Sequence, residues 1–327
     1  MEYLLGAAAV TVATAASVAL IWFLDRFEKD PLWLLTLVFL WGAVPAIVAA
    51  GTLNTVFGLS LNVVFGPFLG NALTASFVAP PVEETAKGLA LLLVFLVLRH
   101  RFTDVLAGIV FGAVVGAGFA WVEDITYIWQ ALAQGGMEAM TAVFVLRVFA
   151  FGFNHAFFTA LTGLGFGLAR ELRSCWLGAA AVLFFFALAI AAHFLHNFLA
   201  SFFDVSGAVV AFLVHWAGVG ALLVVVVAAW VYQWKWIKVE LREEVTRGNV
   251  GERDYRQVSK WFGRLGWELK FLAAFDFAGF FRVRKMFNQL VRLAFLKRDY
   301  RRRPDEATKR RIDETRARVA LLRRKFA

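Results

Sequence analysis

Four residue pairs, each with a polar member, interrupt long apolar stretches of this 327-residue chain and are best suited to chemistry. Each pair is spaced i, i+4, so that on a helix its two members share one face. Ionisable groups at membrane depth cost at least ~2.5–3.5 kcal/mol each and mark functional sites. Acidic groups and imidazoles together activate water, so the set predicts a hydrolytic site. The pairs are Glu83 with Lys87, Phe119 with Glu123, His155 with Thr159, and His193 with Asn197.

Two adjacent glutamates and a lysine stand at the start of one apolar stretch. Glu83 precedes Lys87 by four residues and Glu84 precedes it by three, so the ammonium can pair with either carboxylate. Pro80 and Pro81 come just before them, and prolines and acidic residues are ordinary at the start of a helix. Two carboxylates sharing one cation exceed that need, because one can stay ionised while the other carries a proton. The motif therefore predicts a catalytic base.

Glu123 and Asp124 end a segment that carries glycines at four-residue spacing, at Gly108, Gly112 and Gly116. Small residues at this spacing let membrane helices approach closely, so the glycines indicate packing. The two acidic residues either join the site or mark the interfacial end of their helix.

The histidines allow two kinds of chemistry. A lone histidine such as His155 often only bonds a neighbouring helix, but a second segment carries His193 and His196 on one face. Imidazoles and carboxylates together can ligate zinc, although the spacing is not that of the His-Glu-x-x-His zinc helix. Without a metal, the same side chains can orient water or stabilise an oxyanion.

Composition predicts an all-α, multi-pass transmembrane helical bundle of seven to eight spans. The chain is 61% hydrophobic, and its mean hydropathy is +0.68. Runs of about 20 apolar residues are long enough to cross a ~30 Å hydrocarbon core. Segment 59–80 is diluted by polar residues, and is either an eighth span or a re-entrant stretch. The expected spans are 3–24, 32–50, 84–98, 104–129, 141–169, 175–200 and 208–234.

Basic loops predict the orientation. The loops around Arg99–Arg101 and Arg170–Arg173, and the tail from Lys235, are expected to be cytoplasmic, and alternating spans satisfy all three. The side of the membrane on which the N-terminus lies depends on whether segment 59–80 spans the membrane. At 1.5 Å per residue, Glu123 and His193 lie about 30 and 27 Å from the cytoplasmic starts of their helices. Three of the four polar groups are therefore expected in the outer half of the membrane, and His155, near mid-depth, is close enough to join them.

The chain divides into a transmembrane region, 1–236, and a basic, amphipathic tail, 237–327. The tail holds 25 of the 34 lysines and arginines, interleaved with aromatic residues from Trp261 to Tyr300. This pattern favours helices at an anionic headgroup surface. A run of arginines at 301–303 is also compatible with nucleic acid, but a tail tethered to a span meets lipid first, so no nucleic-acid partner is expected.

With these motifs in hand, the chain resembles the PrsW family of intramembrane proteases. The resemblance rests on the ordered set Glu83-Glu84-x-x-Lys87, Phe119-x-x-x-Glu123, His155-x-x-x-Thr159 and His193-x-x-x-Asn197, and on the charge-balanced loop Asp25…Glu28-Lys29-Asp30-Pro31. It covers about residues 1–235. The resemblance implies the fold of CAAX-type prenyl endopeptidases, a cell-membrane location and hydrolysis of a membrane-anchored protein. In the best-known case the substrate is a membrane-anchored anti-sigma factor.

The resemblance also implies roles for individual residues. Glu83 or Glu84 would activate water, while Glu123, His155 and His193 would complete the site, and these last three are the expected ligands of a divalent metal such as zinc. The same superfamily includes scaffolds without activity, so the fold alone leaves a non-catalytic adaptor open. A transporter using the polar residues as an ion path is a third hypothesis. The sequence sets no oligomeric state.

Overall fold

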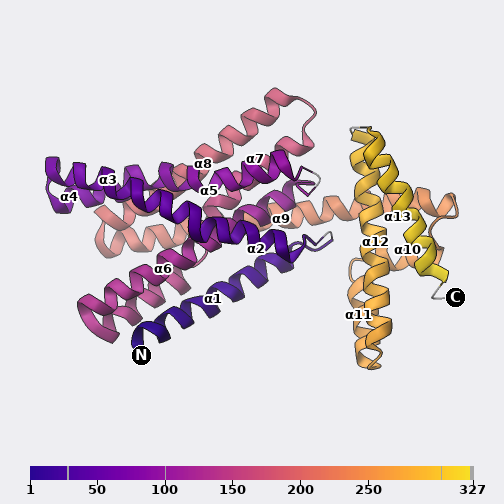
Figure 1. Cartoon of the computed structure of the whole chain (residues 1–327), viewed down its shortest axis with the longest axis horizontal. Helices are drawn as coiled ribbons and strands as arrows, with labels where there is room; N and C mark the ends of the chain where they lie inside the picture. The colour runs from indigo at the N-terminus through magenta and orange to yellow at the C-terminus, as the bar shows by residue number, and fades with distance from the viewer. Residues whose placement is uncertain (28, 100, 303, 325–327) are drawn as a thin grey trace. The chain divides into compact units, whose positions relative to one another are not determined.

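The regular structure of the described residues is entirely helical. A computed structural model describes residues 1–327 except 28, 100, 303 and 325–327, and the side chains of 264, 265 and 324 (Figure 1). The described residues form two compact units: the first comprises 1–25 and 30–226, and the second comprises 26–29 and 227–327. The boundary between the two units, at residues 226 and 227, falls inside the helix Asp204–Thr246. It lies ten residues before the boundary expected from the sequence, at 236 and 237.

The first unit is a bundle of long apolar helices interrupted by three π-helical turns. Among the described residues, five helical segments are long and apolar enough to cross a membrane, namely Glu2–Leu24, Leu32–Phe65, Val105–Glu171, Cys175–Phe202 and Asp204–Thr246. The elements are α1 (Glu2–Leu24), α2 (Leu32–Trp41), η1 (Gly42–Ala46), α3 (Ile47–Phe65), α4 (Pro67–Leu73), η2 (Thr74–Val78), α5 (Ala79–Val97), α6 (Val105–Phe144), η3 (Val145–Ala150), α7 (Asn154–Glu171), α8 (Cys175–Phe202) and α9 (Asp204–Thr246).

Segment 59–80 contains the turn of a helical hairpin. The helix expected to end at residue 50 continues to Phe65, and the chain reverses at Gly66 before α4 begins the returning arm. Its polar residues hold the hairpin together: Asn62 donates to Asn71 Oδ1 at 2.9 Å. The returning arm leads through η2 into α5, whose first two turns carry the glutamate pair.

Helices α6 and α7 form the packed centre of the first unit, and glycines allow their close approach. A Cβ on Gly112 would overlap the Thr159 carbonyl, and one on Gly116 would overlap the carbonyl of His155. The glycine spacing therefore has the packing role that the sequence indicated. It also brings the backbone of His155 directly against α6 at Gly116, about two turns before Glu123.

The chain folds back sharply at Gly136, within the residues assigned to α6. Gly136 has φ 69° and ψ −161°, a conformation that residues with a side chain rarely adopt. Ile128 and Met140 belong to one buried cluster, whereas on a straight helix they would lie about 18 Å apart. The predicted span 141–169 is accordingly broken, into η3, a bend at 151–153, and α7.

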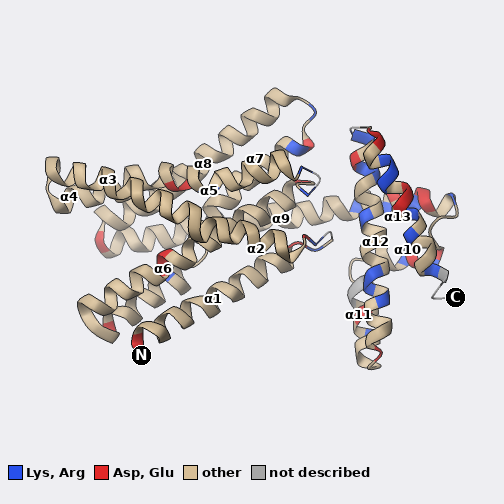
Figure 2. Cartoon of the chain, in the orientation of Figure 1, with Lys and Arg blue, Asp and Glu red and all other residues tan. Residues whose placement is uncertain are grey.

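The second unit has its own hydrophobic core. It consists of the end of α9 with α10 (Glu252–Ser259), α11 (Gly263–Ala273), α12 (Phe277–Arg302) and α13 (Glu306–Arg324). Leu241, Leu290 and Val319 lie at its centre, each no more than 1% exposed. The buried Lys297 ammonium bonds the Glu240 carbonyl at 2.8 Å and lies 2.8 Å from Glu244 Oε1. Charged residues concentrate in this unit (Figure 2).

The short loop after α1 packs within this second unit. Arg26 donates to the carbonyl of Trp261 at 2.5 Å, and its guanidinium lies 4.4 Å from the Trp261 ring centroid and 5.7 Å from that of Trp230. Phe27 also contacts Trp261 edge-on. Because a guanidinium enclosed by aromatic faces gains cation–π energy, this loop is held by the tail.

Candidate active site

The glutamate pair and Lys87 lie on one buried face of α5. The Lys87 Nζ atom is 2.6 Å from Glu84 Oε1 and 3.7 Å from Glu83 Oε2, and it lies 4.3 Å from the centroid of the Phe119 ring. Lys87 and Glu84 are fully buried, and Glu83 is 5% exposed. Asn54 of α3 donates to Glu83 Oε1 at 3.3 Å. The motif is thus a compact charge cluster inside the bundle, as its spacing predicted.

Both oxygens of Glu84 have partners from other helices. Its Oε1 faces His193 Nδ1 of α8 at 3.0 Å in addition to Lys87, and its Oε2 accepts from Thr159 of α7 at 3.1 Å. The ring of Phe158 stacks on His193 with centroids 4.8 Å apart. Glu84 therefore holds three helices together and fixes the orientation of the His193 imidazole.

His155 is held from both sides of its ring. Its Nε2 lies 2.7 Å from Glu123 Oε2, and its Nδ1 lies 3.0 Å from Lys87 Nζ. Since an ammonium only donates, Nδ1 accepts and Nε2 carries the proton that Glu123 receives. The two histidines are therefore held in the same way. In each, a carboxylate, Glu123 for His155 and Glu84 for His193, binds the ring nitrogen that faces away from the centre of the site.

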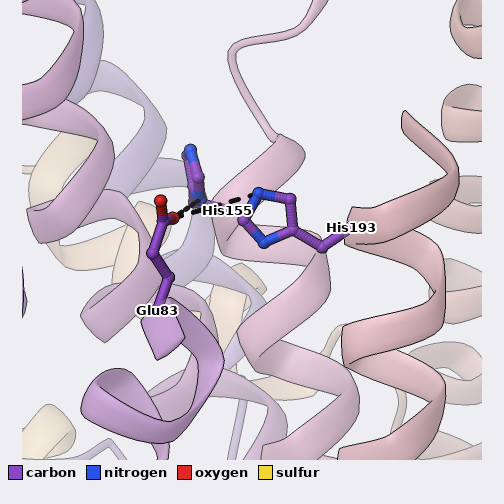
Figure 3. A group of neighbouring side chains, drawn as sticks. All are labelled: Glu83, His155 and His193. Atoms are coloured by element: carbon purple, nitrogen blue, oxygen red, sulfur yellow. Dashed lines mark ion pairs between the residues drawn. The ribbon is translucent and has the colours of Figure 1, made fainter. Parts of the chain in front are cut away.

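The remaining nitrogens converge on one carboxylate oxygen (Figure 3). Glu83 Oε2 lies 4.0 Å from His155 Nδ1 and 3.9 Å from His193 Nε2, and it is buried without a hydrogen-bond partner among the described residues. These three atoms all lie within 4.8 Å of one another. An unsatisfied buried oxygen facing two imidazole nitrogens fits a divalent cation or an activated water.

Glu83, and not Glu123, completes this group of three. Glu123 was the carboxylate expected in the metal set, but in the structure it meets the opposite nitrogen of His155. Adjacent glutamates on a helix face about 100° apart, so only one of the α5 pair can face this centre. Lys87 contacts His155 Nδ1, so a cation ligated by that nitrogen takes the place of this hydrogen bond.

Arg147 of η3 is a site residue that the sequence analysis missed. Its guanidinium pairs with Glu123 at 2.5 Å and with Asp124 at 2.7 Å, and it lies 3.9 Å from the centroid of the Tyr127 ring. It thereby holds the carboxylate that orients His155. A signal existed in the sequence: Arg147 is the only charged Lys, Arg, Asp or Glu residue between 139 and 169. Lone charges at membrane depth favour function.

Replacing Arg147 by glutamine is expected to slow cleavage by about 10- to 100-fold, the usual cost of losing a residue that orients a site histidine. The Arg147→Lys variant keeps the charge and restores part of the rate. Arg173→Gln, at an exposed position, is the matched control and should cleave like the wild type. Initial cleavage rates in membranes measure the effect. Equal rates for Arg147→Gln and Arg173→Gln would exclude this positioning role.

The other candidates lie around this centre. Asn197 donates to the Ala75 carbonyl of η2 at 2.8 Å, and thus ties α8 to the turn that precedes α5. Asn154 Nδ2 lies 2.9 Å from His196 Nε2. The His215 ring lies among Phe151, Phe157 and Trp216. Of the predicted residues, Glu83, Glu84, Lys87, Glu123, His155 and His193 come together directly.

Comparison with known protein families agrees with this geometry. Residues 30–232 match the PrsW family, described as intramembrane metalloproteases. No curated protein and no solved structure matches the chain. The match begins just before α2, ends within α9, and includes every residue of the site. Since it spans well over half of the sequence, this chain belongs to the PrsW family of intramembrane metalloproteases.

Proposed function

We propose that this protease cuts a membrane-anchored protein with water activated between Glu83, His155 and His193. The observation that carries the proposal is the Glu83 Oε2 atom, which is buried without a hydrogen-bond partner among the described residues and faces two imidazole nitrogens. The neighbouring carboxylate of Glu84 is already engaged, since its oxygens bind Lys87, His193 and Thr159. Glu83 is therefore the carboxylate with capacity to accept a proton.

The proposed mechanism assigns each residue a task at a named atom. Glu83 takes the proton of the attacking water and returns it to the leaving amine. His193 Nε2 and His155 Nδ1 orient that water, and Lys87 supplies positive charge toward the developing oxyanion. The buried faces of α5, α7 and α8 keep bulk water away, which strengthens these interactions.

A divalent metal such as zinc fits the same atoms. Glu83, His155 and His193 would hold it, and Glu84 and Glu123 would orient the two histidines from behind. Such a metal supplies Lewis-acid activation of water at neutral pH. Glu83 Oε1, bonded to Asn54 at a long 3.3 Å, then remains as a proton acceptor.

The proposed substrate is a single-pass membrane protein, of which a membrane-anchored anti-sigma factor is the leading case. In the proposed orientation the tail faces the cytoplasm, because Arg99, Arg101 and Arg173 follow the positive-inside pattern. Arg26 supports this orientation, since it packs within the tail unit. Counting α5 and both arms of the Val105–Glu171 segment gives seven crossings, with the N-terminus outside. The basic tail is proposed to contact anionic lipid headgroups and not nucleic acid.

A cleavage assay in membranes tests the proposal. We expect wild-type protein, co-expressed with candidate single-pass proteins, to generate new N-termini that are absent with a His155→Ala/His193→Ala variant of equal abundance. Treatment of purified protein with a zinc chelator should also stop cleavage, and zinc should restore it. Cleavage that survives the double histidine change would refute the site. If cleavage is lost in the double histidine variant but persists in the presence of the chelator, water activation is assigned to Glu83 and the histidines without a metal.

A further inference from the structure

The tail unit contains a cavity that the proteolytic site does not use. It has a volume of about 260 Å³ and lies between α10, α11 and α12. One side of the cavity is an apolar floor from two of these helices, made of Phe271, Val283, Met286, Phe287 and Leu290. Its size is just below the ~300–1,000 Å³ of typical small-molecule pockets, so it suits one narrow apolar group.

Basic residues also line the cavity. Arg253 and Lys270 line it, and the Arg253 guanidinium lies 4.9 Å from the centroid of the Trp267 ring, another lining residue. One acidic residue, Asp254, also lines the cavity, and its carboxylate is engaged by Arg323 at 3.5 Å. The cavity lining therefore combines two cationic groups with an apolar floor, which favours an amphiphile with an anionic head.

The turn next to this cavity is apolar and exposed. Phe275, Phe277 and Phe281 lie at the junction of α11 and α12, with 81%, 57% and 64% of their surfaces exposed. Arg282 and Lys285 follow directly and are also exposed. Exposed aromatic residues beside basic ones are typical of segments that enter the headgroup region of an anionic membrane. The same helices that line the cavity thus carry an exposed tip of aromatic and basic residues.

We propose that this cavity binds one anionic phospholipid, with its phosphate at Arg253 and Lys270 and an acyl chain on the floor. A nucleic acid would satisfy the cations but leave the apolar floor uncovered. A zwitterionic lipid would bring a cation of its own next to Arg253 and Lys270, and a lipid without a phosphate would leave them without an anionic partner. The site is separate from the proteolytic centre. Cleavage assays therefore do not decide this proposal, and its failure leaves the proposed function untouched.

Photolabelling of the full-length protein tests the proposal. The purified chain is reconstituted in phosphatidylcholine vesicles that contain a trace of phosphatidylglycerol with a photoreactive acyl chain, and labelled peptides are mapped by mass spectrometry. We expect label on residues 283–290. The Arg253→Gln/Lys270→Gln variant should carry about tenfold less label on these residues than the wild type. The Arg253→Lys/Lys270→Arg variant, which keeps both charges, should retain it.

A matched control separates the cavity from general charge. Arg310→Gln/Arg318→Gln removes the same two charges from exposed positions of α13 and should label like the wild type. The proposal is overturned if photoreactive phosphatidylcholine labels 283–290 equally, or if wild-type label is absent there. Loss of the label with millimolar glycerol phosphate would assign the cations to a soluble phosphate instead. Loss with polyuridylate would assign them to nucleic acid.

Discussion

Glu83→Gln is expected to reduce the cleavage rate by about 10²- to 10⁴-fold, the usual contribution of a catalytic base. Glutamine has nearly the volume of glutamate, and its amide oxygen can still accept from Asn54, as Glu83 Oε1 does at 3.3 Å. It cannot accept a proton from water or ligate a cation as a carboxylate does. The change removes Glu83 from either form of the proposed mechanism, with or without a metal.

The thermal midpoint of Glu83→Gln should stay close to that of the wild type, because Lys87, which lies 3.7 Å from Glu83 Oε2, keeps its closer partner Glu84 at 2.6 Å. Glu83 Oε2 also has no hydrogen-bond partner to lose among the described residues. Cleavage rate and thermal midpoint, measured on the same detergent-purified sample, together check the prediction. A variant that unfolds early would show that Glu83 is structural. A folded variant that still cleaves would move the base to another residue.

Lys87→Met is expected to have the largest effect on stability. It leaves the fully buried Glu84 carboxylate without the ammonium that lies 2.6 Å from it. Breaking one half of a buried ion pair typically costs about 3–5 kcal/mol, since the remaining charge is uncompensated. Glu84→Gln should also destabilise, and should additionally release His193 from its orienting carboxylate.

The double variant Glu84→Gln/Lys87→Met provides the control for this second prediction. Removing both charges together leaves no isolated ion, so the double variant should be more stable than Lys87→Met alone. Thermal midpoints of the wild type, both single variants and the double variant complete the cycle. Additive losses would show that the pair does not couple, and would contradict the role given to Glu84.

Spacing in the sequence was enough to find the helices that meet at the site. Glu83, Glu123, His155 and His193 were each identified from one turn of helix, and the structure brings them together from four segments. The division of labour between Glu83 and Glu84 was not predictable, because it depends on where α5 is rotated about its axis. Arg147 and Asn54 contact the site through tertiary packing, and the sequence indicates their partners only weakly.

Segment 59–80 and the tail show a similar limit. Polar residues in 59–80 were interpreted by membrane depth, whereas Asn62 and Asn71 bond each other at the hairpin. Aromatic residues of the tail were expected to face lipid. Several of them, including Phe287 and Phe295, instead form the core of the second unit, while Phe275 and Phe281 remain exposed. Composition alone cannot separate a core aromatic from one at a membrane surface.

The bond from Arg26 to Trp261 joins residues 235 positions apart, and this has a consequence for biosynthesis. The first loop emerges from the ribosome early but finds its aromatic partners only after nearly all of the membrane domain has been made. Contacts of such long sequence separation form late. A chain terminated before Trp261 would present Arg26 and Trp230 without this partner, a state open to quality-control proteolysis. We therefore expect chains that include Trp261 to resist such proteolysis better than chains that end before it.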